Sequence, residues 1–267
     1  TEEKPILTAW NEFLNNYQNP TATVEIGLVG KYIELQDAYK SILEALEHAG
    51  AHNQLRVNIH PIHSEDLNRK NVDEKLKGLH GLVVAPGFGD RGIEGKIIAV
   101  RYVREKGIPF LGICLGMQMA VIEYARNVLN LENANSTEMS RGTKHPVIDI
   151  MEDQKMVTEK GGTMRLGAWD CRLEKGSKAH EIYGQDVISE RHRHRYEFNN
   201  DYLKKLDEAG LKATGFNPKT GLVEIVEIED HPWFVGVQYH PEYKSTVLNP
   251  HPLFMAFVKA ASLHKEQ

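Results

Sequence analysis

The residue whose surroundings point most clearly to chemistry is Cys114, in the segment Gly112-Ile113-Cys114-Leu115-Gly116. An apolar run at 108–111 precedes it and a helical pattern at 117–129 follows it. Flanking glycines allow a strand to turn sharply into a helix, which exposes the central side chain above the sheet. A sulfur at a helix N-terminus lies beside unpaired N–H groups and the positive end of the helix dipole, and both favour the thiolate. The segment therefore predicts a cysteine nucleophile; the alternative is a buried, inert cysteine in a glycine-rich turn.

A thiolate nucleophile usually needs a base, and the base usually needs an acid that orients it. Among thirteen histidines, the best candidate is His240 in Val237-Gln238-Tyr239-His240-Pro241-Glu242. It follows a predicted core strand, so it would return to the carboxyl edge of the same sheet. Glu242 could orient the imidazole and stabilise its charged form. A His-Pro turn alone favours a structural role, but together with the Cys114 segment it predicts a general base.

An acyl-transfer site also needs hydrogen-bond donors for the developing oxyanion. The segment Ala85-Pro86-Gly87-Phe88-Gly89-Asp90-Arg91-Gly92 is rich in glycine and follows a predicted strand, so its backbone N–H groups are candidates. The N–H of Leu115, directly after the nucleophile, is a second candidate. A plain strand-to-helix loop is an equal alternative. A phosphate loop is disfavoured because the spacing fits neither G-x-x-x-x-G-K-[ST] nor G-x-G-x-x-G.

Alternating strands and helices must position these groups. Apolar runs at 24–30, 55–62, 79–85 and 108–113 read as strands, and apolar positions at spacings of three and four predict helices at 37–49 and 93–104. Such alternation predicts a mostly parallel sheet with helices on both faces, whose ligands bind at the carboxyl ends of the strands.

The second half of the chain is less regular. Glycines interrupt the pattern between about 130 and 195, which predicts hairpins and loops, whereas 222–228 and 233–239 read as two late strands and 252–263 as a closing helix. Residues 1–22 predict a brief amphipathic helix and a linker. Because the sequence opens with Thr1 rather than Met, we expect it to be part of a longer polypeptide.

Composition narrows the class of protein. Of 267 residues, 41% are hydrophobic and 26% charged, and the net charge is −5, which is typical of a globular protein and argues against nucleic acid as the main partner. No apolar run approaches the roughly 20 residues that span a bilayer, so we expect no membrane partner. Two cysteines cannot form a disulfide framework, which favours a cytoplasmic location.

Together these segments resemble the class I glutamine amidotransferases, and more closely the glutaminase domains of CTP synthases. Residues 110–118 look like the nucleophile segment of that family, and 131–138 like its downstream signature. The stretches 29–32, 37–41, 161–167 and 190–197 are similar to CTP synthase segments, so the resemblance spans nearly the whole chain. It implies an α/β, flavodoxin-like fold with a mostly parallel central sheet flanked by helices and a lid or hairpin insertion. It also implies a glutamine amidotransferase domain at 23–267, with 1–22 as the linker from an N-terminal synthase domain.

The resemblance implies roles for matching positions. Cys114 would attack the side-chain amide of L-glutamine, His240 would pass the proton to departing ammonia, and Glu242 would hold His240. Gly87 and Leu115 would supply the oxyanion N–H groups. The residues implied in binding glutamine are Gly87, Leu115, Gly116, Met117, Gln118, Glu138 and Arg195, and no metal ligand is implied. The family usually has Pro-Gly-Gly-Phe-Gly in the oxyanion loop, whereas here Pro86 occupies a glycine position and cannot donate an N–H.

The resemblance further implies that ammonia aminates UTP to CTP in pyrimidine nucleotide biosynthesis. No cofactor is expected in this chain; ATP, Mg and UTP would bind the synthase domain, and GTP would activate through a lid that includes residues 161–167. The full enzyme would be a homotetramer, and this chain alone a weak glutaminase.

Other readings stay open. The chain could be another Cys-His-Glu hydrolase, such as a γ-glutamyl peptidase, or a regulatory module without turnover. The segment Arg191-His192-Arg193-His194-Arg195 could form a nucleic-acid patch or a metal site, but acidic neighbours favour a solvated loop, with Arg195 at the glutamine pocket. Cys171, in a strand-like run, is expected to serve in packing.

Overall fold

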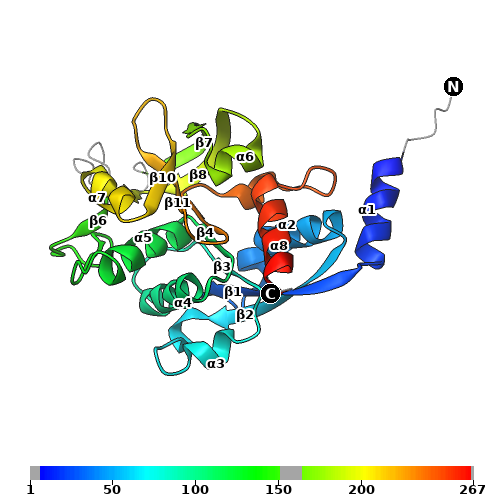
Figure 1. Cartoon of the computed structure of the whole chain (residues 1–267), viewed down its shortest axis with the longest axis horizontal. Helices are drawn as coiled ribbons and strands as arrows, with labels where there is room; N and C mark the ends of the chain where they lie inside the picture. The colour runs from blue at the N-terminus through cyan, green and yellow to red at the C-terminus, as the bar shows by residue number, and fades with distance from the viewer. Residues whose placement is uncertain (1–6, 151–163, 266–267) are drawn as a thin grey trace.

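The computed structural model describes residues 7–150 and 164–265. Nine strands form one sheet in the order β2-β1-β3-β4-β12-β11-β10-β7-β8 (Figure 1). In that order they are β2 (Leu55–His63), β1 (Ala22–Gly30), β3 (Gly81–Val84), β4 (Phe110–Ile113), β12 (Phe234–Val237), β11 (Val223–Ile228), β10 (Leu211–Phe216), β7 (Arg165–Leu173) and β8 (Val187–His194). A second sheet joins β5 (Asn135–Ser136), β6 (Pro146–Ile150) and β9 (Tyr196–Phe198).

Strand direction changes at β12. The pairs from β2 to β12 are parallel, as the alternation of strands and helices predicts, and every pair from β12 to β8 is antiparallel. The α/β fold class is therefore confirmed. The antiparallel half includes the β7–β8 hairpin, inside the region for which the glycines predicted hairpins. Residues 161–163 of the expected lid lie outside the described residues.

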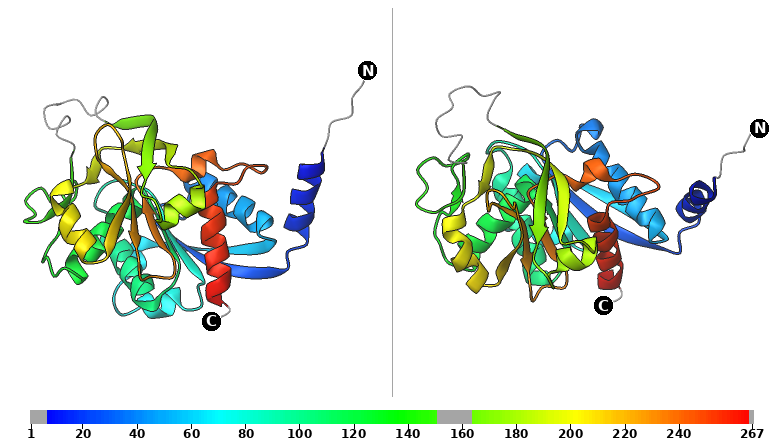
Figure 2. Two further views of the ribbon diagram at one scale, coloured as in Figure 1. Left: turned by 45° about the horizontal axis from the view of Figure 1, so that its top comes forward. Right: turned by 90° about the horizontal axis from the view of Figure 1, so that it is seen from above.

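The helices and short 3-10 turns connect and cover these strands. They are α1 (Thr8–Gln18), η1 (Gln36–Tyr39), α2 (Lys40–His52), η2 (Ser64–Asp66), α3 (Val72–Leu76), α4 (Ile93–Lys106), α5 (Leu115–Asn127), α6 (Lys178–Tyr183), η4 (Asn200–Tyr202), α7 (Leu203–Glu208), η5 (Pro241–Lys244) and α8 (Pro252–Lys265). Helix α1 lies to one side of the sheet in both views of Figure 2, and none of its side chains is buried. None of the helices in the described parts of the chain has the length and apolar character needed to cross a membrane.

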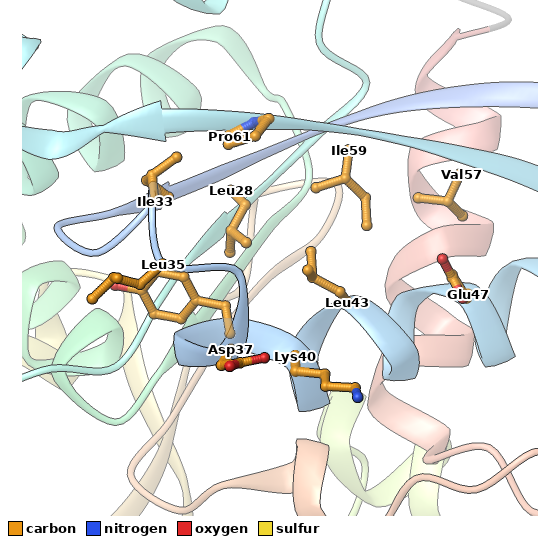
Figure 3. Close-up of a pocket in the computed structure, with 11 residues that line it drawn as sticks. Leu28, Ile33, Leu35, Asp37, Lys40, Leu43, Glu47, Val57, Ile59 and Pro61 are labelled. Atoms are coloured by element: carbon orange, nitrogen blue, oxygen red, sulfur yellow. The ribbon is translucent and has the colours of Figure 1, made fainter.

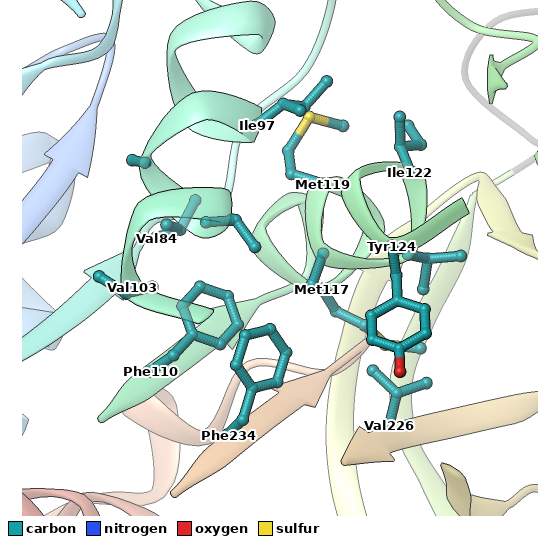
Figure 4. Close-up of a cluster of buried hydrophobic side chains, with 14 of the residues drawn as sticks. Val84, Ile97, Val103, Phe110, Met117, Met119, Ile122, Tyr124, Val226 and Phe234 are labelled. Atoms are coloured by element: carbon teal, nitrogen blue, oxygen red, sulfur yellow. The ribbon is translucent and has the colours of Figure 1, made fainter. Parts of the chain in front are cut away.

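Two apolar layers hold the central strands. Side chains alternate along a strand, so Leu82 and Val84 of β3 pack beneath α4 and α5 while Val83 between them packs beneath α2 and α8. Figure 4 shows the first layer, where the rings of Phe110 and Phe234 from neighbouring strands stack with centroids 4.2 Å apart. Because both faces are covered, the central parallel strands β3, β4 and β12 are buried along their whole length, whereas the edge strand β2 has several exposed polar residues. The carboxyl ends of the parallel strands lie at one edge of the sheet.

Candidate active site

The turn from β4 into α5 places Cys114 at the edge of the sheet. Cys114 is the N-cap of α5 and has φ 51° and ψ −103°, a conformation that non-glycine residues rarely adopt and that is common at functional sites. The turn packs closely against β3: a Cβ on Gly116 would lie 2.1 Å from the Val84 carbonyl oxygen. A larger residue cannot occupy that position without moving the helix. The structure therefore contains the predicted strand–turn–helix with its glycine requirement.

His240 lies at the end of the neighbouring strand. The Cys114 N–H donates to the Val237 carbonyl at 2.7 Å, which aligns the ends of β4 and β12. The His240 N–H donates to the Arg191 carbonyl at 2.8 Å, and its ring Nδ1 lies 2.7 Å from Glu242 Oε1. Its other ring nitrogen, Nε2, is buried and has no hydrogen-bond partner among the described residues. The structure thus brings the three predicted side chains together and leaves Nε2 available for a substrate.

The electrostatics of the site favour a charged imidazole. Burial alone would lower the pKa of His240, but the negative charges of Cys114 and Glu242 oppose it and raise the pKa to about 11. An imidazolium at neutral pH can donate a proton and can stabilise an adjacent thiolate. The arrangement can therefore hold a thiolate–imidazolium pair.

The glycine-rich loop after β3 faces this pair. The Gly89 N–H donates to Glu138 Oε1 at 2.9 Å, whereas the Gly87 N–H donates to no acceptor among the described residues and Pro86 has no N–H. Leu115 is the first residue of α5, so its N–H has no acceptor within the helix. A Cβ on Gly87 would lie 3.4 Å from Leu115 Cδ2, which shows that the two residues adjoin. The N–H groups of Gly87 and Leu115 are therefore candidate donors at the turn that carries Cys114.

Of the residues expected to bind a substrate, Gln118 is the most firmly held. It is buried, and its side-chain amide donates to the Tyr196 carbonyl at 3.0 Å and to Gln238 Oε1 at 3.1 Å. Its own Oε1 is left to accept from a ligand. Met117 differs, because its side chain is fully buried in the apolar layer beneath α5; only its backbone can face a substrate.

Glu138 and Arg195 come from distant parts of the chain to one place. Burial raises the pKa of Tyr196, and the charges of Glu138 and Arg195 act on that phenol in opposite directions. Glu138 follows β5, and Arg195 stands between β8 and β9. Both side chains therefore lie in the surroundings of Tyr196, and a carboxylate and a guanidinium can bind the ammonium and the carboxylate of an amino acid.

Gln238 is a site residue that sequence reasoning did not identify. It is fully buried, and its Nε2 donates to Cys114 Sγ at 3.6 Å while its Oε1 accepts from Gln118. The sequence did hold a signal: a glutamine two positions before His240 in an extended segment shares its face.

The basic segment 191–195 is not a solvated loop, and that expectation is wrong. It lies largely in β8, where burial alternates, so Arg191 and Arg193 are exposed and His192 and His194 point inward. Period-two alternation of polar residues was the missed signal. His192 Nδ1 lies 2.7 Å from His194 Nε2, and no cluster of three or more His, Cys, Asp or Glu side chains in the described ranges has the geometry of a metal site.

A buried charge cluster supports this part of the site. Arg165 Nη1 lies 3.4 Å from Glu197 Oε1, and its Nη2 lies 2.6 Å from Glu224 Oε1. Burial raises the pKa of Glu197 to about 8 and that of Glu224 to about 7, with Arg165 opposing both shifts. Burial, with the charge of Arg165, lowers the pKa of His194 to about 3 and also lowers that of His192. The histidines are therefore neutral, and Arg165 is the cation that the carboxylates require.

We expect Arg165→Met to destabilise the protein by about 3–5 kcal/mol at pH 8, because the change leaves two buried carboxyl groups without their cation. Both carboxyl pKa values are raised above the ordinary glutamate value of 4.5, so the folded state holds protons that the unfolded chain releases, and this contribution to stability falls as pH rises toward 8. Without Arg165 the two pKa values rise further, so the loss should shrink toward pH 5. Urea unfolding at both pH values measures it.

The matched control is Arg172→Met on the same strand. Its guanidinium is 51% exposed and pairs with Glu174 at 2.8 Å, so roughly 1 kcal/mol or less should be lost. Equal losses for the two variants, or a loss at position 165 that does not change with pH, would show that the buried cluster does not depend on its arginine.

Other features lie apart from this edge. Cys171 is fully buried in β7 and burial raises its pKa, which agrees with a packing role. A hollow of about 560 Å³ lies between α2 and the β1–β2 edge, with Leu28, Leu43 and Ile59 on its walls (Figure 3). Neither Cys114 nor His240 lines it.

Comparisons with known proteins agree with this site. Residues 34–260 match the model of the family described as glutamine amidotransferase class-I. The chain is 67% identical over 263 residues to a CTP synthase of Flavobacterium psychrophilum and 62% identical over 262 residues to one of Cytophaga hutchinsonii; each match covers 98% of this chain and 49% of the relative. The chain thus spans about half the length of these relatives.

One similar solved structure consists of the corresponding domain without a synthase domain. It is the glutaminase domain of Trypanosoma brucei CTPS with bound acivicin, which matches with a TM-score of 0.84 and 40% identity over 90% of this chain and 94% of the other. The family match covers most of the sequence, and the structural match covers nearly all of a glutaminase domain. The chain therefore belongs to the class I glutamine amidotransferase family, as a glutaminase domain of the CTP synthase type.

Proposed function

We propose that Cys114, His240 and Glu242 hydrolyse L-glutamine to glutamate and ammonia through a thioester. The observation that carries this proposal is the buried imidazole held by Glu242 at 2.7 Å, with its free Nε2 on the side of a cysteine at a helix N-terminus. Such a set supplies a nucleophile, a proton carrier and an orienting acid.

In the first half-reaction the Cys114 thiolate attacks the side-chain carbonyl carbon of glutamine. The carbonyl oxygen becomes an oxyanion that accepts from the N–H groups of Gly87 and Leu115. The intermediate then collapses: the C–N bond breaks, His240 gives its Nε2 proton to the departing nitrogen, and ammonia leaves. A thioester at Cys114 and a neutral imidazole remain.

In the second half-reaction His240 takes a proton from water, and the hydroxide oxygen attacks the thioester carbonyl. The same two N–H groups hold the second oxyanion. Its collapse breaks the C–S bond, which releases glutamate and returns the thiolate–imidazolium pair. Water and glutamine are consumed, and glutamate and ammonia are formed.

The other predicted residues would select glutamine. The Oε1 of Gln118 can accept from the α-ammonium group, and Glu138 can do the same, whereas Arg195 can pair with the α-carboxylate. Gly116 and Met117 would contribute backbone only. Because these contacts recognise both charged ends of the amino acid, they favour free glutamine over a peptide.

For the whole enzyme we propose that residues 23–267 form the glutamine amidotransferase domain and that 1–22 connect it to a synthase domain. Ammonia would then aminate UTP to CTP with ATP and Mg on that other domain, and GTP would activate glutamine hydrolysis. A cytoplasmic homotetramer is the proposed assembly. The observation that supports a further domain is that CTP synthases similar to nearly the whole chain are about twice its length.

The substrate is tested by comparing ammonia release from L-glutamine with glutamate release from a γ-glutamyl dipeptide. We expect turnover of glutamine, slow in the chain alone and faster when a synthase domain and GTP are added, and at least about tenfold lower kcat/KM with the dipeptide. Preference for the dipeptide would favour a γ-glutamyl peptidase. No turnover of either compound, alone or with the synthase domain and GTP, would favour a regulatory module.

A further inference from the structure

A lysine lies fully inside the protein next to the proposed oxyanion loop. Lys96 is on the buried face of α4 and is 1% exposed, which is rare for lysine. Its Nζ donates to the Ala85 carbonyl oxygen at 2.7 Å. Burying an ammonium is costly unless it interacts with opposite charge or acceptors, so the fold keeps it there against a penalty.

A second lysine holds the same loop from the other side. Lys31 follows β1, and its Nζ donates to the Phe88 carbonyl oxygen. The next N–H, that of Gly89, donates to Glu138, so the Phe88–Gly89 peptide is held at both ends. The loop is thus held by carbonyl groups on both sides of Gly87, while the Gly87 N–H itself is left free.

Gly87 lies between these lysines and α5. A Cβ added there would be 3.8 Å from Lys96 Nζ, 3.8 Å from Lys31 Cε and 3.4 Å from Leu115 Cδ2. Both lysines therefore lie against the residue whose N–H the reaction would use. Their charges are close to the place where an oxyanion would form.

Lys96 also interacts with the cysteine. Burial and the positive charge of Lys31 lower the pKa of Lys96 to about 7, whereas the negative charge of Cys114 raises it. An ammonium at Lys96 and a thiolate at Cys114 attract each other, so positive charge on Lys96 favours negative charge on the sulfur. Lys31 and Cys114 are the charged groups that act on Lys96; η2, which also packs against α4, presents the buried hydroxyl of Ser64.

We propose that Lys96 is a positioning residue of this site, whose ammonium fixes the Ala85–Gly89 loop with the Gly87 N–H free and places positive charge beside the thiolate and the oxyanion. This proposal rests on the proposed glutaminase function. The loop has one candidate donor fewer because of Pro86. A charge beneath the loop offsets that loss, because it stabilises the same oxyanion without needing a further N–H.

The test is Lys96→Met, which keeps the length of the side chain and removes its charge. We expect kcat for glutamine to fall about 10–100-fold with KM changed less than about threefold, because the lost interactions act on charge that develops in the transition state. We also expect alkylation of Cys114 by iodoacetamide to slow about 3–10-fold at pH 6, where Lys96 is charged, and its pH profile to move to higher pH. Lys106→Met, exposed on the same helix, is the matched control and should change neither quantity.

The alkylation readout needs no glutamine, so it separates this proposal from the proposed function. If the wild-type chain does not hydrolyse glutamine, the proposed function is wrong. The difference in Cys114 alkylation between wild type and Lys96→Met still tests the role of Lys96. Circular dichroism reports folding; if Lys96→Met is unfolded, Lys96→Gln, which retains a donor for the Ala85 carbonyl, is measured by the same two assays. An alkylation profile and kcat equal to wild type in the folded variant would overturn the proposal.

Discussion

Cys114→Ala is expected to lower the rate of glutamine hydrolysis by at least about 10⁴-fold, because no other group can form the thioester. The site offers no replacement: Cys171 is fully buried in β7, and Cys114 is the residue at the β4–α5 turn. The folded structure should survive, since alanine removes only the sulfur and the turn is held by the neighbouring glycines. Coupled-enzyme detection of glutamate, together with a urea unfolding curve, gives both quantities.

Cys171→Ala is the matched control for the loss of a thiol. It removes a buried sulfur in a strand that contributes no proposed catalytic group, so activity should stay within about threefold of wild type once folding is confirmed. Residual hydrolysis in Cys114→Ala comparable to that of this control would show that the reaction does not pass through Cys114.

His240→Ala should reduce hydrolysis by about 10³–10⁴-fold, because it removes both the proton donor for ammonia and the cation that stabilises the thiolate. A second effect distinguishes this role from simple packing. Without the imidazolium, alkylation of Cys114 at pH 7 should slow, and its pH profile should move to higher pH. Initial rates with glutamine and with iodoacetamide measure the two effects separately.

The raised pKa of His240 determines the pH range over which its imidazole stays charged. His240 is a base whose pKa is raised to about 11, so it stays protonated below that value and loses its proton only as pH rises through it. The imidazolium of the wild type should therefore persist between pH 6 and 9. His60→Ala, a partly exposed histidine paired with Glu25, serves as the control and should leave both profiles in place. Wild-type alkylation that is slow at pH 6–7 and rises steeply only above about pH 8, as for an isolated thiol, would contradict the ion pair.

The parallel half of the fold could be predicted well from the sequence, because the local apolar patterns there agree with the burial of the strands and helices. The run 108–113 is apolar throughout, and 24–30 is apolar except for Glu25, because both faces of these strands are covered over most of their length. Helices α2 and α4 show the spacing of one buried face. Helix α5 begins two residues before its predicted start, at Leu115, because the turn at Cys114 is tighter than the apolar pattern alone indicates. The short helices α3, α6 and α7 and the second sheet were not predicted, since few residues support each of them.

The proposed catalytic set was predictable because its residue types stand at strand ends, where a parallel sheet gathers side chains. Its surroundings were not. Gln238, Lys96 and Arg165 look locally like ordinary polar residues of a strand or helix. Their roles depend on contacts outside their own elements, with Cys114, Ala85, Glu197 and Glu224. The periodicity of a sequence predicts which face of a helix or strand a side chain occupies. It does not predict which residue of another element that side chain will contact.

The central claim is that Cys114 is the nucleophile that attacks glutamine. The most direct measurement treats the intact chain with an electrophilic glutamine analogue and locates the adduct by peptide mass spectrometry. We predict one adduct on the peptide that contains Cys114, suppressed by excess L-glutamine and absent from Cys114→Ala. An adduct that persists in Cys114→Ala, or that glutamine does not suppress, would contradict the assignment.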